Sequence, residues 1–354
     1  TEIYTLSLHD ALPICQALGA DWQESDCTAA IWRASSLTDG QWRHAQGKSP
    51  QFLLCKDIPT ADSGAVFHSM RVAPSPQPSF RDSSQLRLVS SHTGWVRSCA
   101  WSPDSTRCLS AGMDGSLRVW DAATGEQLLN IQGHSDQVYS CAWSLDSTRL
   151  LSAGDDQNLR VWDAATGEQL LSIQGHSGSI FSCAWSPDST RLLSAGMDGS
   201  LRVWDAATGE QLLNIQGHSD QVYSCAWSLD STRLLSAGDD QNLRVWDAAT
   251  GEQLLSIQGH SGSIFSCAWS PDSIRLLSAG DDQRLRVWDA ATGEQLLNLQ
   301  CSFGWASSCA WSPDSTRLFA WGSNQSLRVW DAATGEQLLY IQNYTGGVNS
   351  CAWS

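Results

Sequence analysis

The residues of this chain that could perform catalysis are a histidine, a serine and an aspartate that lie near one another in the sequence. His134 precedes the segment RLLSAGDDQNLRVWD, residues 149–163, which contains Ser152 and Asp156. A hydroxyl nucleophile, an imidazole base and a carboxylate that orients the base are the parts of a hydrolytic triad. The same groups also form ordinary hydrogen bonds, so the sequence must decide between an active site and a structural role.

The candidate triad is one copy of a repeated pattern with a period of about 42 residues. Six tryptophans precede an aspartate in the frame LRVWDAATGEQLL: Trp120, Trp162, Trp204, Trp246, Trp288 and Trp330. The motif CAW has the same period and begins at Cys99, Cys141, Cys183, Cys225, Cys267, Cys309 and Cys351. Residues 113–196 and 197–280 are identical except that Thr190 corresponds to Ile274. An enzyme does not need several copies of one active site, so the repetition favours architecture over catalysis.

The composition excludes several classes of protein. The chain has 354 residues, of which 42% are hydrophobic, enough to bury a large core. Its formal charge of −16 makes it a poor partner for nucleic acid, whose phosphates attract Lys and Arg. No apolar run approaches the roughly 18 residues that cross a bilayer. We therefore expect neither nucleic acid nor a membrane as a partner, and a cytoplasmic location.

The chain has twelve cysteines, and seven of them occupy the same place in successive repeats. No Cys-x-x-Cys or mixed Cys/His spacing typical of a metal site is present. We therefore expect reduced, small, buried residues and predict no metal and no other cofactor. A metal shared between repeats is the alternative.

The two ends of the chain differ from the repeats. TLSLHDALPI, residues 5–14, resembles one reading frame of a sequencing adapter, so residues 1–14 are interpreted as an artefact. Residues 15–84 do not repeat, contain the strand-like runs 51–58 and 65–73, and finish in a Pro/Ser-rich linker at 74–84. The chain stops at SCAWS, where every earlier copy continues, which predicts a gene fragment broken at both ends.

Each repeat unit contains four strand-like runs separated by turn residues. In one unit these runs are residues 137–144, 149–154, 159–163 and 168–174. The glycine of the AATG turn suits a left-handed backbone position. Four short strands per repeat of this length describe one blade of a β-propeller. The sequence therefore predicts an all-β propeller over residues 85–354.

The predicted ring contains six complete four-stranded blades and a partial seventh. Residues 85–91 form a fourth strand without the first three, and residues 346–354 form a first strand without the rest. We expect these two strands to meet in the seventh blade, because closing the ring removes unpaired sheet edges. The middle strands of that blade are either missing or supplied by 51–58 and 65–73. The sequence favours the first alternative.

The motifs GH, WSPDS, LSAG, DD and VWDAATG recur together at fixed spacing, and in this the chain resembles the WD-repeat β-propellers. The resemblance covers about three quarters of the chain. It implies that a Trp, a Ser, a His and an Asp of one blade form a hydrogen-bonded structural tetrad. The positions that match in this chain are His92, Ser110, Asp114, Trp120; His134, Ser152, Asp156, Trp162; His176, Ser194, Asp198, Trp204; His218, Ser236, Asp240, Trp246; and His260, Ser278, Asp282, Trp288.

A tetrad of this kind has a physical purpose that does not depend on the resemblance. A buried indole N–H needs an acceptor, which a serine on the neighbouring strand provides. A histidine that bridges from this serine to the aspartate holds two loops together, and each bond contributes on the order of 1 kcal/mol. The sequence therefore predicts a structural clamp and no catalytic residue.

The sixth repeat departs from the tetrad pattern. It has Ser302, Ala320 and Asn324 at the matching positions and keeps only Trp330, and the partial seventh has Tyr344 in place of the histidine. We expect these blades to lack the clamp and to form the weakest sector of the ring, with the fastest hydrogen exchange. A diverged binding sector rich in aromatic residues is the alternative.

The resemblance also implies that a partner docks on the narrower face, where the clamped loops lie. It indicates the two positions flanking the first apolar residue of each inner strand and the position before the tetrad aspartate. These are Trp95, Arg97, Met113; Gln137, Tyr139, Asp155; Ser179, Phe181, Met197; Gln221, Tyr223, Asp239; Ser263, Phe265, Asp281; and Trp305, Ser307, Ser323. Aromatic residues and Met interleaved with Asp resemble interface hot spots more than solvated loops, and ordinary loop residues are the alternative. The face would suit a protein or peptide segment with apolar anchors and some basic charge, including a repetitive or multivalent one.

Three classes of function remain to be compared. The first is a non-catalytic interaction scaffold, which we favour. The second is a ligand-sensing propeller of a larger multidomain effector, such as an NTPase or protease, whose upstream domain is missing. The third is a propeller enzyme, which is disfavoured because the acids predicted near the opening, Asp155, Asp239 and Asp281, come from nonadjacent or repeated blades and no phosphate loop or zinc spacing accompanies them.

Overall fold

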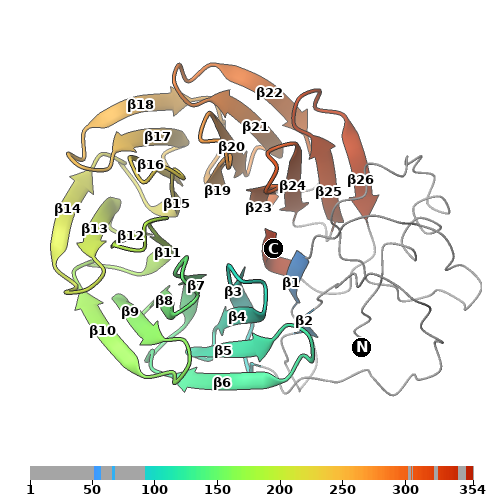
Figure 1. Cartoon of the computed structure of the whole chain (residues 1–354). Helices are drawn as coiled ribbons and strands as arrows, with labels where there is room; N and C mark the ends of the chain where they lie inside the picture. Colours follow the sequence, from blue (N-terminus) through green and yellow to red (C-terminus); the bar gives the residue numbers. More distant parts are fainter. Residues whose placement is uncertain are drawn as a thin grey trace, which may run out of the picture.

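The computed structural model describes residues 52–56, 66–67, 92–301, 304, 306–322, 326–341 and 348–353. Within these residues every regular element is a β-strand, and six antiparallel four-stranded sheets follow one another around a ring (Figure 1). The all-β class and the six complete blades are thus confirmed. The predicted artefact at 1–14, the linker at 74–84 and the strand at 85–91 lie outside the described residues. No helix that is long and apolar enough to span a membrane occurs in the described part of the chain.

The blades are numbered in chain order, and each begins with its innermost strand. Blades one and two consist of β3 (Val96–Trp101), β4 (Arg107–Gly112), β5 (Ser116–Asp121), β6 (Gln127–Gln132); β7 (Val138–Trp143), β8 (Arg149–Gly154), β9 (Asn158–Asp163) and β10 (Gln169–Gln174). Blades three and four consist of β11 (Ile180–Trp185), β12 (Arg191–Gly196), β13 (Ser200–Asp205), β14 (Gln211–Gln216); β15 (Val222–Trp227), β16 (Arg233–Gly238), β17 (Asn242–Asp247) and β18 (Gln253–Gln258). Blades five and six consist of β19 (Ile264–Trp269), β20 (Arg275–Gly280), β21 (Arg284–Asp289), β22 (Gln295–Gln300); β23 (Ala306–Trp311), β24 (Arg317–Gly322), β25 (Ser326–Asp331) and β26 (Gln337–Ile341).

The burial of each strand follows from its place in the blade. In β8, Leu150, Leu151, Ser152 and Ala153 are all fully buried, because a middle strand is covered on both faces by neighbouring blades. In the outer strand β10 only Ile173 is buried, since this strand has solvent on one side. The continuous apolar run in RLLSAG and the mixed pattern in QLLSIQ are therefore signals of blade position.

The hydrophobic core lies between the blades. At the first junction, Leu109, Leu117 and Val119 of blade one pack against Leu150 and Trp162 of blade two. Equivalent clusters, with Val or Ile at the start of the innermost strand, occupy the next three junctions. Each blade therefore depends on its neighbours for burial, as expected for a repeat that cannot cover its own apolar faces.

A three-stranded sheet lies between blades six and one. β27 (Val348–Trp353) pairs with β1 (Phe52–Lys56), which pairs with β2 (Val66–Phe67). β27 contacts both β3 and β23, the innermost strands on either side (Figure 1). The preference for missing middle strands is therefore wrong, since the non-repeat segment supplies strands to this sheet. The addition of residues 85–91 to this sheet, which would close a seventh blade, stays a prediction.

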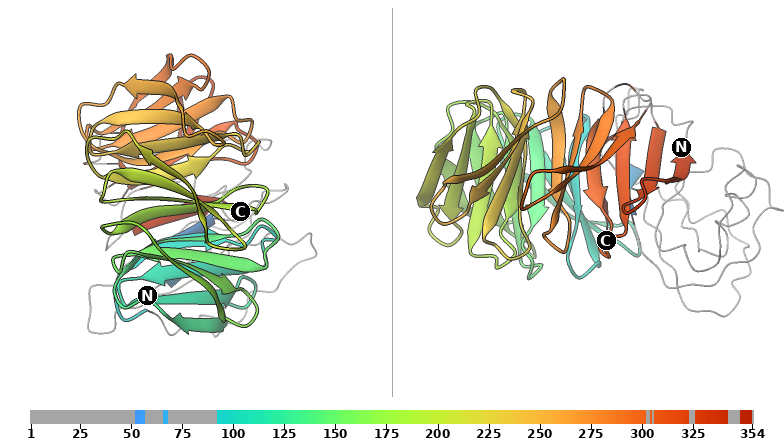
Figure 2. Two further views of the ribbon diagram at one scale, coloured as in Figure 1. Left: turned by 90° about the vertical axis from the view of Figure 1, so that its left-hand side faces the viewer. Right: turned by 90° about the horizontal axis from the view of Figure 1, so that it is seen from above.

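The connections between strands collect at the two ends of the ring, which Figure 2 shows edge-on. We call the end that carries turns such as 155–158 and loops such as 133–137 the top face. We call the end that carries turns such as 144–148 and 164–168 the bottom face. The tetrads and the predicted partner positions belong to the top face.

Candidate functional site

The predicted tetrad of blade two forms one continuous chain of hydrogen bonds. The indole Nε1 of Trp162 donates to Ser152 Oγ over 2.8 Å, and this oxygen lies 2.7 Å from His134 Nε2. His134 Nδ1 lies 2.9 Å from Asp156 Oδ1. With the proton on Nδ1, each group donates to the next, from indole to carboxylate. Ser152 is fully buried, so a substrate carbonyl has no access to its hydroxyl.

Four further blades contain the same arrangement. The indole–serine distances lie between 2.8 and 3.0 Å, and the serine–histidine distances between 2.7 and 2.8 Å. The structure therefore brings together all five sets of four predicted residues. In addition to blade two, these sets are His92, Ser110, Asp114, Trp120; His176, Ser194, Asp198, Trp204; His218, Ser236, Asp240, Trp246; and His260, Ser278, Asp282, Trp288.

The tetrad aspartate connects the loop that enters the blade to the turn between the second and third strands. Asp156 accepts hydrogen bonds from the backbone N–H of Ser135, on the entering loop, and from that of Asn158, at the end of its own turn. Burial acts to raise the pKa of the Asp156 carboxyl, but hydrogen bonds from His134, Arg160 and Ser135 outweigh burial and hold this pKa well below its ordinary value. Burial lowers the pKa of His134, so the imidazole is neutral near pH 7.

An arginine that was not predicted from the sequence contacts the tetrad aspartate. Arg160 Nη1 lies 2.6 Å from Asp156 Oδ2, and Arg244 and Arg286 make the same contact in blades four and five. Arg160 is paired across the strands with Ser152. That register, together with the arginine in every LRVWD motif, is the signal that would have found it.

The glycine of the GH motif is required by the tryptophan of the tetrad. A Cβ atom on Gly133 would lie 2.0 Å from Cη2 of Trp162, and one on Gly217 would lie 2.3 Å from the same atom of Trp246. No side chain fits at such distances, so the backbone must pass directly over the indole. This close approach explains why glycine and histidine occur together before each of these blades.

Blade six differs from the others at the tetrad positions that the structure describes. Ala320 occupies the serine position and is fully buried, and Trp330 keeps the indole. A methyl group cannot accept the hydrogen bond that serine accepts elsewhere. Ser302, Asn324 and Tyr344 lie outside the described residues, so the lower stability of this sector stays a prediction.

The predicted partner positions surround the top end of the innermost strands. Trp95 and Met197 are the most exposed of their apolar members, at 52% and 51%. Most of the others are partly buried; they include Arg97, Met113, Gln137, Tyr139, Asp155, Ser179, Phe181, Gln221, Tyr223, Asp239, Ser263 and Phe265. Asp281 is exposed, and the Ser307 hydroxyl donates to the Trp321 carbonyl oxygen. Trp305 and Ser323 lie outside the described residues.

Four of these residues form a continuous row of rings, which we call the aromatic arc: Tyr139, Phe181, Tyr223 and Phe265. Their ring centroids are separated in turn by 5.5, 5.5 and 5.6 Å, with tilted planes. They belong to β7, β11, β15 and β19, the innermost strands, which border the central opening in Figure 1. The sequence predicted the four positions but not their mutual contact, since each ring comes from a different blade.

Two aspartates of the top face join neighbouring blades. Asp155 accepts a hydrogen bond from the Ser179 hydroxyl of blade three, and Asp239 accepts one from Ser263 of blade five. The pKa of the Tyr139 and Tyr223 hydroxyls is raised, mostly by burial and then by these carboxylates, which lie beside the aromatic arc. The top face therefore combines aromatic surface with negative charge.

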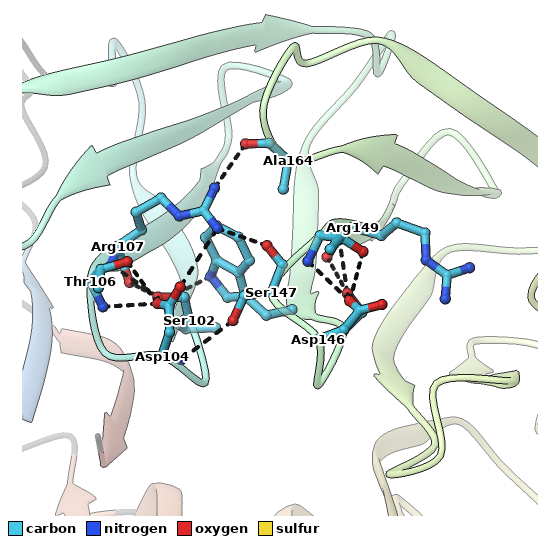
Figure 3. A network of polar contacts seen from close by, with 12 residues as sticks. Ser102, Asp104, Thr106, Arg107, Asp146, Ser147, Arg149 and Ala164 are labelled. Atoms are coloured by element: carbon cyan, nitrogen blue, oxygen red, sulfur yellow. Dashed lines mark hydrogen bonds and ion pairs between the residues drawn. The ribbon is translucent and has the colours of Figure 1, made fainter.

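The bottom face carries an interaction that the sequence analysis missed, which we call the inter-blade latch. The guanidinium of Arg107 donates to the carbonyl oxygens of Ser147 and Ala164 in blade two, over 2.7 and 3.1 Å (Figure 3). Its Cζ atom also lies 4.6 Å from the centroid of the Trp143 ring. Equivalent stacked pairs are Arg149–Trp185, Arg191–Trp227, Arg233–Trp269 and Arg275–Trp311. An arginine begins the second strand of every blade, and this regularity was the sequence signal that could have predicted the inter-blade latch.

Comparison with known proteins gives two matching families. The WD domain, G-beta repeat family matches residues 83–121 and 125–163. The family described as the first β-propeller of IFT122 matches residues 179–354. No individually curated protein matches the chain.

Proposed function

Because the chain belongs to the WD-repeat β-propellers, we propose that it is a non-catalytic scaffold that binds a protein or peptide segment on its top face. Propellers of this family typically serve as interaction scaffolds rather than as enzymes. The single observation that carries the proposal for this chain is the aromatic arc. Rings that stand around an opening and are only partly buried offer anchoring surface to a ligand.

The tetrads support the proposal by making this face rigid, and we propose that their role is structural. Each one joins the loop entering a blade to the turn beside it through hydrogen bonds that measure 2.7 to 2.9 Å in blade two. A binding surface that is already ordered loses less conformational entropy when the ligand arrives. The buried serines are consistent with this role and not with that of a nucleophile.

The proposal is tested by selecting ligands from a displayed library of random peptides and mapping where they bind. Phe181→Lys removes one ring of the aromatic arc and places a positive charge there, and Leu145→Lys places the same charge on the bottom face, where Leu145 is 58% exposed. We expect the selected peptides to lose at least tenfold in affinity for the first variant and to bind the second unchanged. Peptides that bind both variants equally well would overturn the assignment to the top face.

A further inference from the structure

The aromatic arc contains the same pair of rings twice. Tyr139 and Phe181 lie in blades two and three, and Tyr223 and Phe265 lie in blades four and five. The two pairs have centroid separations of 5.5 and 5.6 Å. The sequence blocks that contain them differ only at one position of the bottom face. Any difference between the two copies as binding sites must therefore come from the residues beside them.

The neighbour of the first copy is a cation of the chain itself. The Cζ atom of Arg97 lies 5.8 Å from the centroid of the Tyr139 ring and 5.5 Å from that of Trp95. Within the described residues, Arg97 forms no ion pair and its Nε has no hydrogen-bond partner, so its charge faces aromatic rings. The corresponding neighbour of Tyr223 is Phe181, at 5.5 Å between centroids.

The carboxylates around the two tyrosines are equivalent, so the cation makes the two copies electrostatically different. Burial and then Asp155 raise the pKa of the Tyr139 hydroxyl, Arg97 opposes this effect, and Asp136 adds to it. At Tyr223, burial, Asp239 and Asp220 all raise the pKa, and no described cation acts against them. The first copy is partly neutralised, and the second keeps its negative potential.

We propose that the second copy, formed by Tyr223, Phe265 and Asp239, receives a basic side chain of the bound segment, whereas Arg97 supplies the corresponding charge to the first copy and closes it to another cation. The inference rests on the proposed function and specifies the chemistry of the partner. A guanidinium or ammonium group gains from aromatic faces and from a nearby carboxylate at once. The formal charge of −16 also attracts basic segments to the chain over longer distances.

The two copies can be followed separately by NMR of the full chain labelled with ¹³C in its tyrosine rings. The variants Tyr139→Phe and Tyr223→Phe assign the signals. The probe is the peptide acetyl-Gly-Arg-Gly-amide, and the control peptide contains citrulline, which has the shape of arginine without its charge. We expect the arginine peptide to shift the Tyr223 signals saturably, with Tyr139 unaffected and at least tenfold weaker binding of the citrulline peptide.

Substitution of Arg97 then tests whether this residue closes the first copy. In Arg97→Gln, and in Arg97→Met, which keeps more of the apolar stem, we expect the arginine peptide to shift Tyr139 as well as Tyr223. Equal responses of both tyrosines in the unaltered protein would overturn the inference, as would equal binding of the citrulline peptide. These two results need no Arg97 variant, so the inference stays falsifiable if the variants do not fold.

The failure of this inference is distinguishable from failure of the proposed function. Display-selected peptides that bind the top face, and keep their affinity when citrulline replaces arginine and glutamine replaces lysine, would overturn the inference and leave the scaffold intact. Selected peptides whose affinity is unchanged by Phe181→Lys would instead overturn the top-face proposal itself.

Discussion

The top and bottom faces of the propeller are held together by different chemistry acting over different units. On the top face, the tetrad of blade two joins Trp162, Ser152 and Asp156 of the blade to His134 on the loop entering it. On the bottom face, the latch of Arg107 reaches from blade one to the backbone of blade two. The tetrads therefore connect groups within one blade and its entering loop, whereas the latches connect one blade to the next.

The two kinds of interaction also differ in burial, which determines what their loss costs. The tetrad serine is fully buried, and the Asp156 side chain is 3% exposed, so removal of a member strands a polar group away from water. The Arg107 side chain is 22% exposed and retains solvent as an alternative partner. We therefore expect larger losses of stability from the top face than from the bottom face.

The largest effect is expected for Trp162→Ala. This substitution removes a large ring that is 3% exposed and packed at the junction between blades one and two, and it leaves Ser152 without its donor. Deletion of a buried aromatic side chain costs about 3–5 kcal/mol. Urea denaturation measures the loss, and Trp204→Ala in blade three is the matched variant with the same environment. A loss below about 1 kcal/mol in both would contradict the packing described.

The next largest loss of stability is expected for Asp156→Ala, which removes the carboxylate that ends the hydrogen-bond chain. His134 loses its acceptor, and Arg160 loses its partner at 2.6 Å, so two polar groups are left partly buried. Loss of one partner from such a pair costs about 2–4 kcal/mol. The control is Asp136→Ala, an exposed aspartate on the neighbouring loop, which should change stability by less than about 0.5 kcal/mol.

This substitution also decides between the clamp and the hydrolytic triad. If the role is structural, Asp156→Ala lowers the free energy of unfolding, and the folded variant still binds top-face peptides with unchanged affinity. Unchanged stability together with the loss of an esterase or peptidase activity would establish catalysis instead.

A smaller effect is expected for Arg149→Met, which breaks the latch between blades two and three. The variant loses the bond to the Ser189 carbonyl at 3.0 Å and the stacking on Trp185 at 4.5 Å, but keeps much of the apolar stem. We expect a loss of about 1–2 kcal/mol. Amide hydrogen exchange should show the loss at the junction of blades two and three. Faster exchange throughout blade two alone would contradict the assignment of the latch to the contact between blades.

The repeat pattern allowed the interior of each blade to be predicted well. Residues 149–154 form β8 as expected, because a run that is apolar on both sides suits only a strand covered on both faces. The tetrad positions were implied by the resemblance to the WD-repeat β-propellers, and the common period of serine, aspartate and tryptophan placed one copy in each of five blades. Local spacing is informative there because strands adjacent in the sequence are also adjacent in the sheet.

Contacts between blades could not be predicted in the same way. Arg107 and Trp143 each recur once per unit, but the period is the same whether an arginine stacks on its own blade or on the next one. The pairing of β1 with β27 has no periodic signal at all, because β1 lies in the segment that does not repeat. The spacing of residues within one repeat unit can be read from the sequence. Which residues meet across two units depends on how the blades pack against each other.

The effect expected to be smallest near pH 7 is a dependence of stability on pH that arises from the tetrads and not from the latches. Burial lowers the pKa of His134, His218 and His260, so the folded chain binds fewer protons at these sites than the unfolded chain, in which the pKa is about 6.5. Their contribution is therefore fully present above about pH 6.5 and is lost as the pH falls below that value. Each histidine contributes at most one proton, or about 1.4 kcal/mol per pH unit, to the slope.

Urea midpoints should be constant between about pH 7 and 8 and fall from about pH 6.5 to 5. His218→Gln should reduce this slope, whereas Arg149→Met should lower the whole curve and leave its slope unchanged. An unaltered slope in His218→Gln would contradict the assignment of part of the acid sensitivity to this histidine.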